Sequence, residues 1–159
     1  MNSSRDVHAT ISTREERNRT VVRRYADEVW GEGDADAADK ILTQEQVYHD
    51  PTFSGAEHVD EFKEFIRGYR AAFPDLRYDI EGTIAEDDFV AFWGRVTGTQ
   101  EGEFFGIPPT GNRIDIMGIG VVRLEDGKIA DRWANFDVYG MLKQLDADST
   151  GGDRRDESE

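Results

Sequence analysis

The chain has 159 residues, no cysteine and a formal net charge of −15, from 34 acidic and 19 basic residues. This length suits one domain with a hydrophobic core, and the lack of cysteine excludes disulfides, thiolate metal sites and a cysteine nucleophile. The negative charge would repel a phosphate backbone, so we expect no nucleic-acid partner. No run of about 18 apolar residues and no apolar signal core are present, so we expect no membrane span and a cytoplasmic location.

The basic residues are mostly arginine, and the only lysines are Lys40, Lys63, Lys128 and Lys143. An acidic, lysine-poor composition is typical of halophilic proteins. In concentrated salt the Debye length falls to about 3 Å, which screens the self-repulsion of such a surface. An ordinary acidic cytosolic protein is the alternative interpretation, and the sequence leaves both open.

The N-terminal segment 1–13 lacks apolar periodicity, and we expect a flexible tail there. From Thr13 to Trp30 the apolar residues follow helical spacing, and Thr13 with Glu16 forms a capping box. The glycines that follow Trp30 end this predicted helix.

Two further helices are predicted on either side of a short strand. Asp34 caps a helix that runs to Leu42, and residues 47–49 form a brief strand that ends before Pro51. Apolar residues at helical spacing from Val59 to Phe73 then predict a third helix, which a proline ends.

The rest of the chain has the pattern of β-strands, at 76–85, 89–99 and 114–124 and again after residue 128. Two prolines make 106–111 a loop, and Asp126-Gly127 predicts a tight hairpin. Helices followed by an antiparallel meander predict the α+β class. We expect a single domain over residues 14–146 and an acidic disordered tail over 147–159.

Asp131 is the first candidate for chemistry. Alternation along the last strand places Asp131 on the same face as Ile129, Trp133 and Asn135. On an apolar face, desolvation would raise the pKa of this carboxyl towards a value useful for proton transfer. The alternative is an ion pair with one of three arginines: Arg95, Arg113 or Arg132.

His49 and Asp50 form a second candidate pair, at a strand end before a proline. Imidazole titrates near neutrality, so His49 is a candidate proton shuttle; the alternative is a histidine that hydrogen-bonds a turn. The sequence shows no metal-ligand spacing, no phosphate-binding loop and no serine nucleophile elbow. We therefore expect no metal and no cofactor.

Aromatic residues are numerous, and most are expected in the core. Trp93 and Trp133 have a stronger claim to a pocket because each lies on a strand, in alternate register to aliphatic residues or beside a polar group. We predict a substrate-binding set of Trp30, Asp50, Trp93, Trp133 and Asn135.

Several short motifs occur in a characteristic order and spacing over residues 21–145. They are Tyr25–Asp34, His49–Pro51, Phe73–Leu76, Gly98–Thr99, Gly102–Phe104, Gly106–Gly111, Gly118–Ile119, Arg123, Asp126–Ile129, Asp131, Trp133 and Phe136–Asp137. Together they resemble the SnoaL-like polyketide cyclases, often called ester cyclases, of the nuclear-transport-factor-two-like superfamily.

The resemblance implies N-terminal helices packed in a strongly curved antiparallel sheet, a cone-shaped barrel whose open end is a pocket. It also implies a homodimer, an acid/base role for Asp131 and a place for His49 at the pocket rim. The sequence departs from active relatives at two places: residues 117–120 offer no polar partner to the carboxylate, and Gln100 stands where histidine is common.

The expected function is binding of an apolar, carbonyl-bearing small molecule. The expected chemistry is that of a cofactor-free cyclase, a lyase or isomerase of the aldol or ester-cyclase type, with Asp131 as acid/base and His49 or Asn135 assisting. The alternative is a noncatalytic ligand-binding or dimerisation module on the same fold. Hydrolysis of an epoxide or ester is a weaker third interpretation because the sequence shows no second polar partner for a water.

Overall fold

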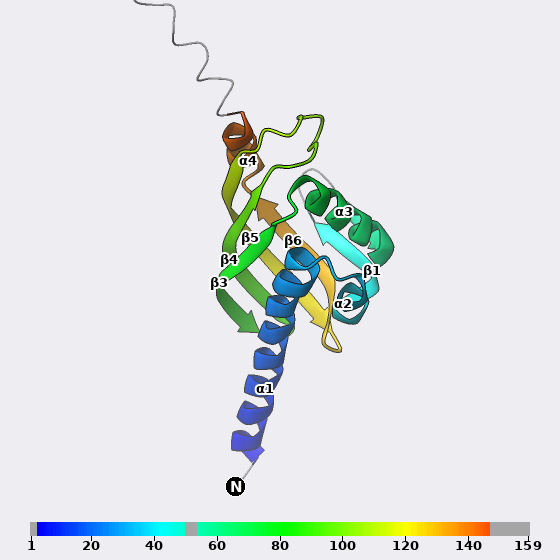
Figure 1. Cartoon of the computed structure of the whole chain (residues 1–159). Coiled ribbons are helices and arrows are strands. Elements are labelled where there is room, and N and C mark those ends of the chain that lie inside the picture. Colours follow the sequence, from blue (N-terminus) through cyan, green and yellow to red (C-terminus); the bar gives the residue numbers. More distant parts are fainter. Residues whose placement is uncertain (1–2, 50–53, 147–159) are drawn as a thin grey trace, which may run out of the picture.

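The computed structural model of the chain describes residues 3–49 and 54–146 and confirms the α+β class (Figure 1). Six strands form one sheet in the order β2-β1-β6-β5-β4-β3. The strands are β1 (Leu42–His49), β2 (Ser54–His58), β3 (Arg77–Glu86), β4 (Phe89–Thr99), β5 (Arg113–Glu125) and β6 (Lys128–Phe136). The consecutive pairs β3–β4, β4–β5 and β5–β6 are antiparallel, as expected of a meander. Strand β1 runs parallel to β6, which makes the sheet mixed.

The helices are α1 (Ser3–Arg24), the π-helix η1 (Tyr25–Gly31), α2 (Ala35–Ile41), α3 (Val59–Ala72) and α4 (Val138–Leu145). Helix α1 begins at Ser3, inside the segment that was expected to be a tail, and its N-terminal part projects beyond the sheet, whereas the rest of the helix contacts β3 and β4 (Figure 1). Its first part lacks a regular apolar face, which explains why periodicity did not predict it. The α-helical geometry ends at Arg24, and the predicted end of the first helix near Trp30 corresponds to the end of η1.

Local capping explains where the short helices begin. The Asp34 side chain accepts hydrogen bonds from the backbone N–H groups of Asp36 at 2.9 Å and Ala37 at 3.1 Å, which confirms it as the cap of α2. Asp137 caps α4 in the same way, by accepting from the N–H of Gly140 at 2.8 Å. Helix α4 and strand β2 were not predicted, because each is short.

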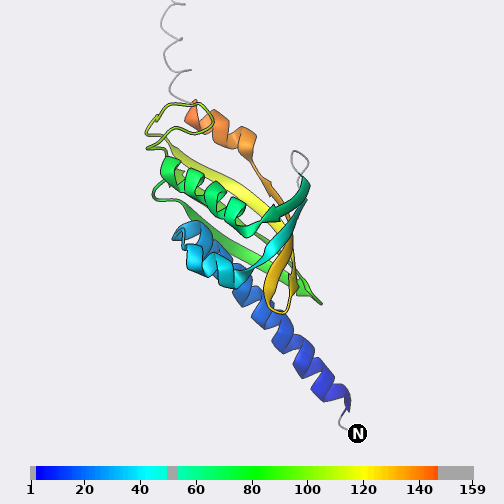
Figure 2. The ribbon, with the colours of Figure 1, turned by 90° about the vertical axis from the view of Figure 1, so that its right-hand side faces the viewer.

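The core lies between the helices and the inner face of the curved sheet. Figure 2 shows α2 and α3 along one side of the sheet, with α4 at the end opposite to α1. The loop between β4 and β5 joins α4 through Asn112, whose Nδ2 donates to the carbonyl oxygens of Gln144 and Leu145, both at 3.2 Å. This arrangement leaves one end of the curved sheet, near α3 and α4, as the place where a cavity can open.

Candidate functional site

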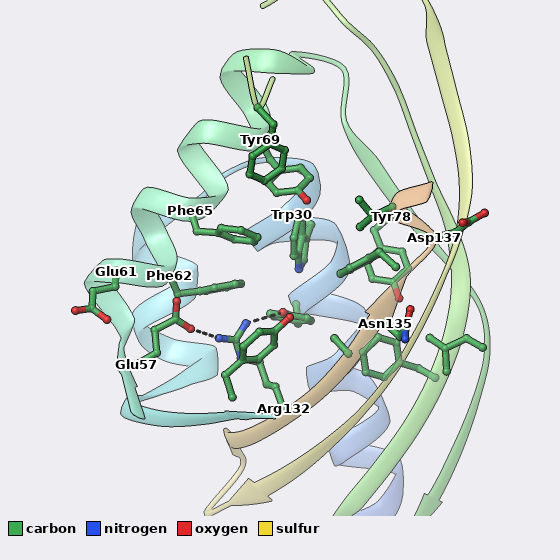
Figure 3. Close-up of a pocket in the computed structure, with 18 of the residues that line it drawn as sticks. Trp30, Glu57, Glu61, Phe62, Phe65, Tyr69, Tyr78, Arg132, Asn135 and Asp137 are labelled. Carbon is green, nitrogen blue, oxygen red and sulfur yellow. Dashed lines mark hydrogen bonds and ion pairs between the residues drawn. The ribbon is translucent and has the colours of Figure 1, made fainter. Parts of the chain in front are cut away.

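A cavity of about 890 Å³ opens among η1, α3, the inner face of the sheet and the start of α4. Its volume lies within the range of small-molecule sites, about 300–1,000 Å³. The wall is mostly aromatic, and Figure 3 shows rings from the helices and from the strands converging on one space. The principal aromatic residues are Trp30, Phe62, Phe65, Tyr69, Tyr78 and Phe136.

Two glycines of β5 make room for these rings. A Cβ atom on Gly118 would lie 2.8 Å from the Tyr78 hydroxyl oxygen, and one on Gly120 would lie 2.6 Å from Cζ of Phe92. No ordinary side chain can approach so closely without displacing the ring. Residues 117–120, which offer no polar partner to Asp131, therefore shape the cavity because two of them are glycines without a side chain.

The polar end of the cavity is built on Arg132, which is 4% exposed. Its Nη2 donates to Oε2 of Glu57 at 2.5 Å, and its Nη1 donates to the Tyr25 hydroxyl at 3.3 Å (Figure 3). The guanidinium carbon also lies 3.9 Å from the Phe62 ring centroid and 4.9 Å from that of Tyr48. A buried cation needs such partners, because desolvation of an unpaired charge is costly.

Titration at this end of the cavity is set mainly by burial. Burial raises the pKa of Glu57 above the usual 4.5, although the charge and hydrogen bond of Arg132 act in the opposite direction. The negative charge of Glu61, which also lines the cavity, raises the pKa of Glu57 further. Burial raises the pKa values of Tyr69 and Tyr78 as well, so both hydroxyls stay protonated near neutral pH and can donate a hydrogen bond.

Among the cavity residues, two buried donors have no hydrogen-bond partner in the described part of the chain: Trp30 Nε1 and Arg132 Nε. Such unpaired buried donors are uncommon in native proteins, and each needs an explanation. In Figure 3 the indole nitrogen of Trp30 points towards the space above Arg132. The polar end of the cavity therefore offers donors that no acceptor in the described part of the chain satisfies.

Of the predicted site residues, Trp30 and Asn135 line the cavity. His49, Trp93, Asp131 and Trp133 do not belong to its wall. The remaining residue of the predicted set, Asp50, lies outside the described residues.

Asp131 lies in a charged network apart from the cavity wall. Arg123 Nε donates to Asp131 Oδ2 at 2.6 Å, and Nη2 of the same arginine lies 2.5 Å from that oxygen. His49 Nε2 is 3.3 Å from Asp131 Oδ1, and the His49 ring stacks on Trp133 with centroids 4.3 Å apart. The alternative of an ion pair is therefore realised, with Arg123 instead of the three arginines considered. An acid/base role for Asp131 stays a prediction.

Asp131 shares a face of β6 with Trp133, as predicted, but an irregularity in the strand places it on the opposite face from Ile129. Arg123 pairs with Asp131 and Leu124 pairs with Ile129, so Ala130 is an extra residue in the ladder. Ile129 and Ala130 are both buried, and the alternation restarts after them. Arg132 therefore faces the cavity.

Sequence reasoning missed Arg132 as a cavity residue, and with it Glu57 and Tyr25. A single sequence gives little sign of a bulge that holds a small residue such as Ala130. Glu57 lies in β2, whose sequence has no apolar alternation. One usable signal was the spacing of five between Tyr25 and Trp30, which fits a π-helix better than an α-helix.

Gln100, noted as a departure from active relatives, supports the loop beside the cavity. It is fully buried, and its Nε2 donates to the carbonyl oxygens of Gly102 and Ile107, both at 3.1 Å. Its Oε1 accepts from the Thr110 hydroxyl at 2.7 Å. These bonds fix the loop that carries Phe105, which lines the cavity and is 74% exposed.

Within residues 3–49 and 54–146, no cluster of three or more histidine, aspartate or glutamate side chains is placed to hold a metal ion. No helix in this part of the chain is long and apolar enough to cross a membrane.

Comparison with known proteins gives consistent results. The family model described as SnoaL-like polyketide cyclase matches residues 20–145. A protein from Acidithiobacillus ferrooxidans that carries the name of a polyketide cyclase is 30% identical, with a TM-score of 0.76 over 82% of this chain and 95% of that one. One from Jannaschia sp. CCS1, named a SnoaL-like polyketide cyclase, is 27% identical, with a TM-score of 0.76 over 84% and 94%. IdmH from Streptomyces antibioticus shares the fold, at 24% identity and a TM-score of 0.73 over 80% and 97%. No curated protein matches the sequence.

Proposed function

The chain belongs to the SnoaL-like polyketide cyclase family, and on this premise we propose that its aromatic cavity binds a flat, apolar, carbonyl-bearing molecule. We further propose that it catalyses a cofactor-free proton transfer of the aldol or ester-cyclase type. The observation that carries the proposal is a buried carboxylate–guanidinium pair, Glu57 and Arg132, in the wall of a cavity that is lined mostly by aromatic rings. An apolar cavity with few convergent polar groups is the usual form of a small-molecule site.

Glu57 is the base in this proposal. Its raised pKa makes it a better proton acceptor than an exposed glutamate, while the charge of Arg132 favours its ionised form. Glu57 takes the proton from a carbon between two carbonyl groups, and the electron pair of that C–H bond forms the enolate. The enolate oxygen carries the negative charge, which the Arg132 guanidinium stabilises.

Ring closure follows without any other reactant. The enolate carbon attacks a second carbonyl of the same molecule and forms a C–C bond, and the resulting alkoxide takes the proton back from Glu57. The aromatic wall contributes by holding the two carbonyl groups close to each other, which replaces an encounter in solution by a step within one bound molecule.

The test compares Glu57→Gln with Asp131→Asn during turnover of a series of β-keto esters and polyketide-like compounds. We expect Glu57→Gln to lower kcat by about 10²- to 10⁴-fold, the usual contribution of a general base. Asp131→Asn is expected to keep turnover close to the wild-type value. The opposite result would return the acid/base role to Asp131.

Folding must be controlled in this comparison, because Glu57→Gln leaves the buried Arg132 without its carboxylate. Breaking a buried ion pair costs about 3–5 kcal/mol of stability. Glu57→Asp keeps the charge but moves it by one methylene, so it is the second variant. A thermal melt of each variant shows whether the protein assayed is folded.

A noncatalytic ligand-binding module on the same fold is the second candidate function. The observation that favours it is that the Asp131 carboxylate is paired with Arg123 and His49 and is not part of the cavity wall. In this case compounds would bind and quench tryptophan fluorescence, but none would be turned over by the wild type.

A further inference from the structure

The N–H of Trp30 is a hydrogen-bond donor that finds no acceptor within residues 3–49 and 54–146. Trp30 is 3% exposed, lines the cavity, and its Nε1 has no partner among the described residues. A buried donor without an acceptor costs about 1–3 kcal/mol. Since the nitrogen points towards the cavity (Figure 3), a ligand oxygen is the acceptor that would remove this cost.

The π-helix η1 is what brings Trp30 to the cavity together with Tyr25. An α-helix has 3.6 residues per turn, so residues five apart point about 140° away from each other. In a π-helix the hydrogen bonds run from i to i+5, so residues five apart lie about one turn apart and on nearly the same side. Tyr25 and Trp30 occupy the first turn and the end of η1, and both line the cavity.

Arg70 of α3 fixes the end of η1. Its Nη1 donates to the carbonyl oxygen of Trp30 at 3.0 Å and also to that of Gly31. Its Nη2 donates to the carbonyl oxygen of Pro74 at 3.1 Å, in the loop after α3. A cation that satisfies the free carbonyls at a helix end stabilises that end.

Gly33 permits this approach. It has a φ of +67°, and a Cβ atom on it would lie 2.6 Å from Cδ of Arg70. Any other residue would be strained there and would push the Arg70 side chain away. Gly33 and Arg70 therefore act together on the end of η1, although neither lines the cavity.

We propose that Trp30 determines specificity by donating its indole N–H to an acceptor oxygen of the ligand, and that Arg70 is the positioning residue that holds η1 in the geometry this requires. The proposal rests on the proposed function, since it assumes that a small molecule occupies this cavity. The nitrogen is buried in the wall of the cavity that the ligand would occupy. Ligands of the same shape without the oxygen leave the donor unpaired.

The test uses two flat probes of matched shape, 2-acetylnaphthalene and 2-isopropenylnaphthalene, which differ by C=O against C=CH₂. Calorimetric titration of the wild type is expected to show a preference of about three- to tenfold for the ketone, the value of one hydrogen bond. In Trp30→Phe the ratio of the two affinities is expected to fall to about one. A ratio is used because loss of the larger ring weakens both probes.

Arg70 is tested through the same ratio. Gly33→Ala and Arg70→Gln are expected to reduce the ketone preference at least twofold, and Arg70→Lys is expected to restore part of it in a folded protein. Arg67→Lys is the matched control, because Arg67 is an exposed arginine of α3 that pairs with Glu64. A purely structural role of Arg70 would lower the melting temperature and leave the ratio unchanged.

Each outcome decides between the two proposals. If neither probe binds the wild type, the proposed function fails, and this inference fails with it. If both probes bind the wild type equally, or if Trp30→Phe keeps the ketone preference, the role of the indole N–H is overturned while the cavity remains a ligand site. Loss of the preference in Trp30→Phe but not in Gly33→Ala or Arg70→Gln overturns the role of Arg70.

Discussion

Neighbouring residues on one strand have different chemical roles in this protein, as Asp131 and Arg132 show. Asp131 is held by Arg123, which also binds Glu125 at 2.8 Å. Arg132 is buried against Phe62 and holds the carboxylate of the cavity. We therefore expect Glu57, whose pKa burial raises, to be the carboxylate that acts in a proton transfer in the cavity.

The pH dependence of turnover tests this assignment. A base must be deprotonated to act, so kcat/KM is expected to fall as the pH falls through the pKa of Glu57, with an acid limb above the usual 4.5. The charge of Glu61 raises the pKa of Glu57, so Glu61→Gln is expected to move the limb to lower pH. Glu64→Gln, an exposed change on the same helix, is the control and leaves the limb in place. An acid limb at or below pH 4.5 in the wild type would exclude Glu57 as the base.

At the scale of the element, strand β5 shapes the cavity through two glycines, and this gives a prediction for stability. Gly118→Ala and Gly120→Ala are expected to lower the free energy of unfolding by about 1–3 kcal/mol, because the new methyl group overlaps Tyr78 or Phe92. Displaced rings would also weaken binding of both naphthalene probes. Gly68→Ala on the exposed side of α3 meets no atom within 4 Å and is expected to gain about 0.5–1 kcal/mol from helix propensity. Urea denaturation measures all three; equal stabilities would contradict the packing argument.

The elements that the sequence predicted well are those with a strong local signal. The Asp126-Gly127 hairpin, the cap at Asp34 and the apolar periodicity of α3 are local properties, and the structure confirms each. The prediction that Asp131 shares the face of the buried Ile129 depended on an unbroken alternation along β6, and one extra residue, Ala130, puts the two on opposite faces. Prediction of the site failed there because a bulge is fixed by the pairing of two strands and leaves no clear sign in one of them.

For the whole molecule, the family resemblance predicted the long-range arrangement of the helices and strands, which local sequence patterns do not contain. Strand pairing between β1 and β6 is parallel and joins residues far apart in sequence, so periodicity cannot reveal it. The resemblance predicted the closure of helices against a curved sheet, and the fold confirms it. The polar end of the cavity depends on that closure, because Glu57, Arg132 and Tyr25 come from three different elements.

The outer face of the sheet and the net charge together predict a dimer that depends on salt. Ile84, Trp93 and Met117 are exposed apolar side chains, and Trp93 and Met117 lie on the neighbouring strands β4 and β5. An apolar patch across neighbouring strands is typical of an interaction surface, and we expect a second copy of the chain to cover it. Two copies of net charge −15 repel each other, so the dimer is expected to be weak at low salt.

Sedimentation velocity over a range of KCl concentrations measures this equilibrium. The Debye length falls from about 10 Å at 0.1 M to about 3 Å at 1 M, so the dissociation constant is expected to decrease as KCl rises. Met117→Lys places a charge within the apolar patch and is expected to give a monomer at every salt concentration, whereas Leu142→Lys on α4 keeps the dimer. A wild type that stays monomeric even at 1 M KCl would show that the charge is not what keeps the copies apart, and that this face does not pair them.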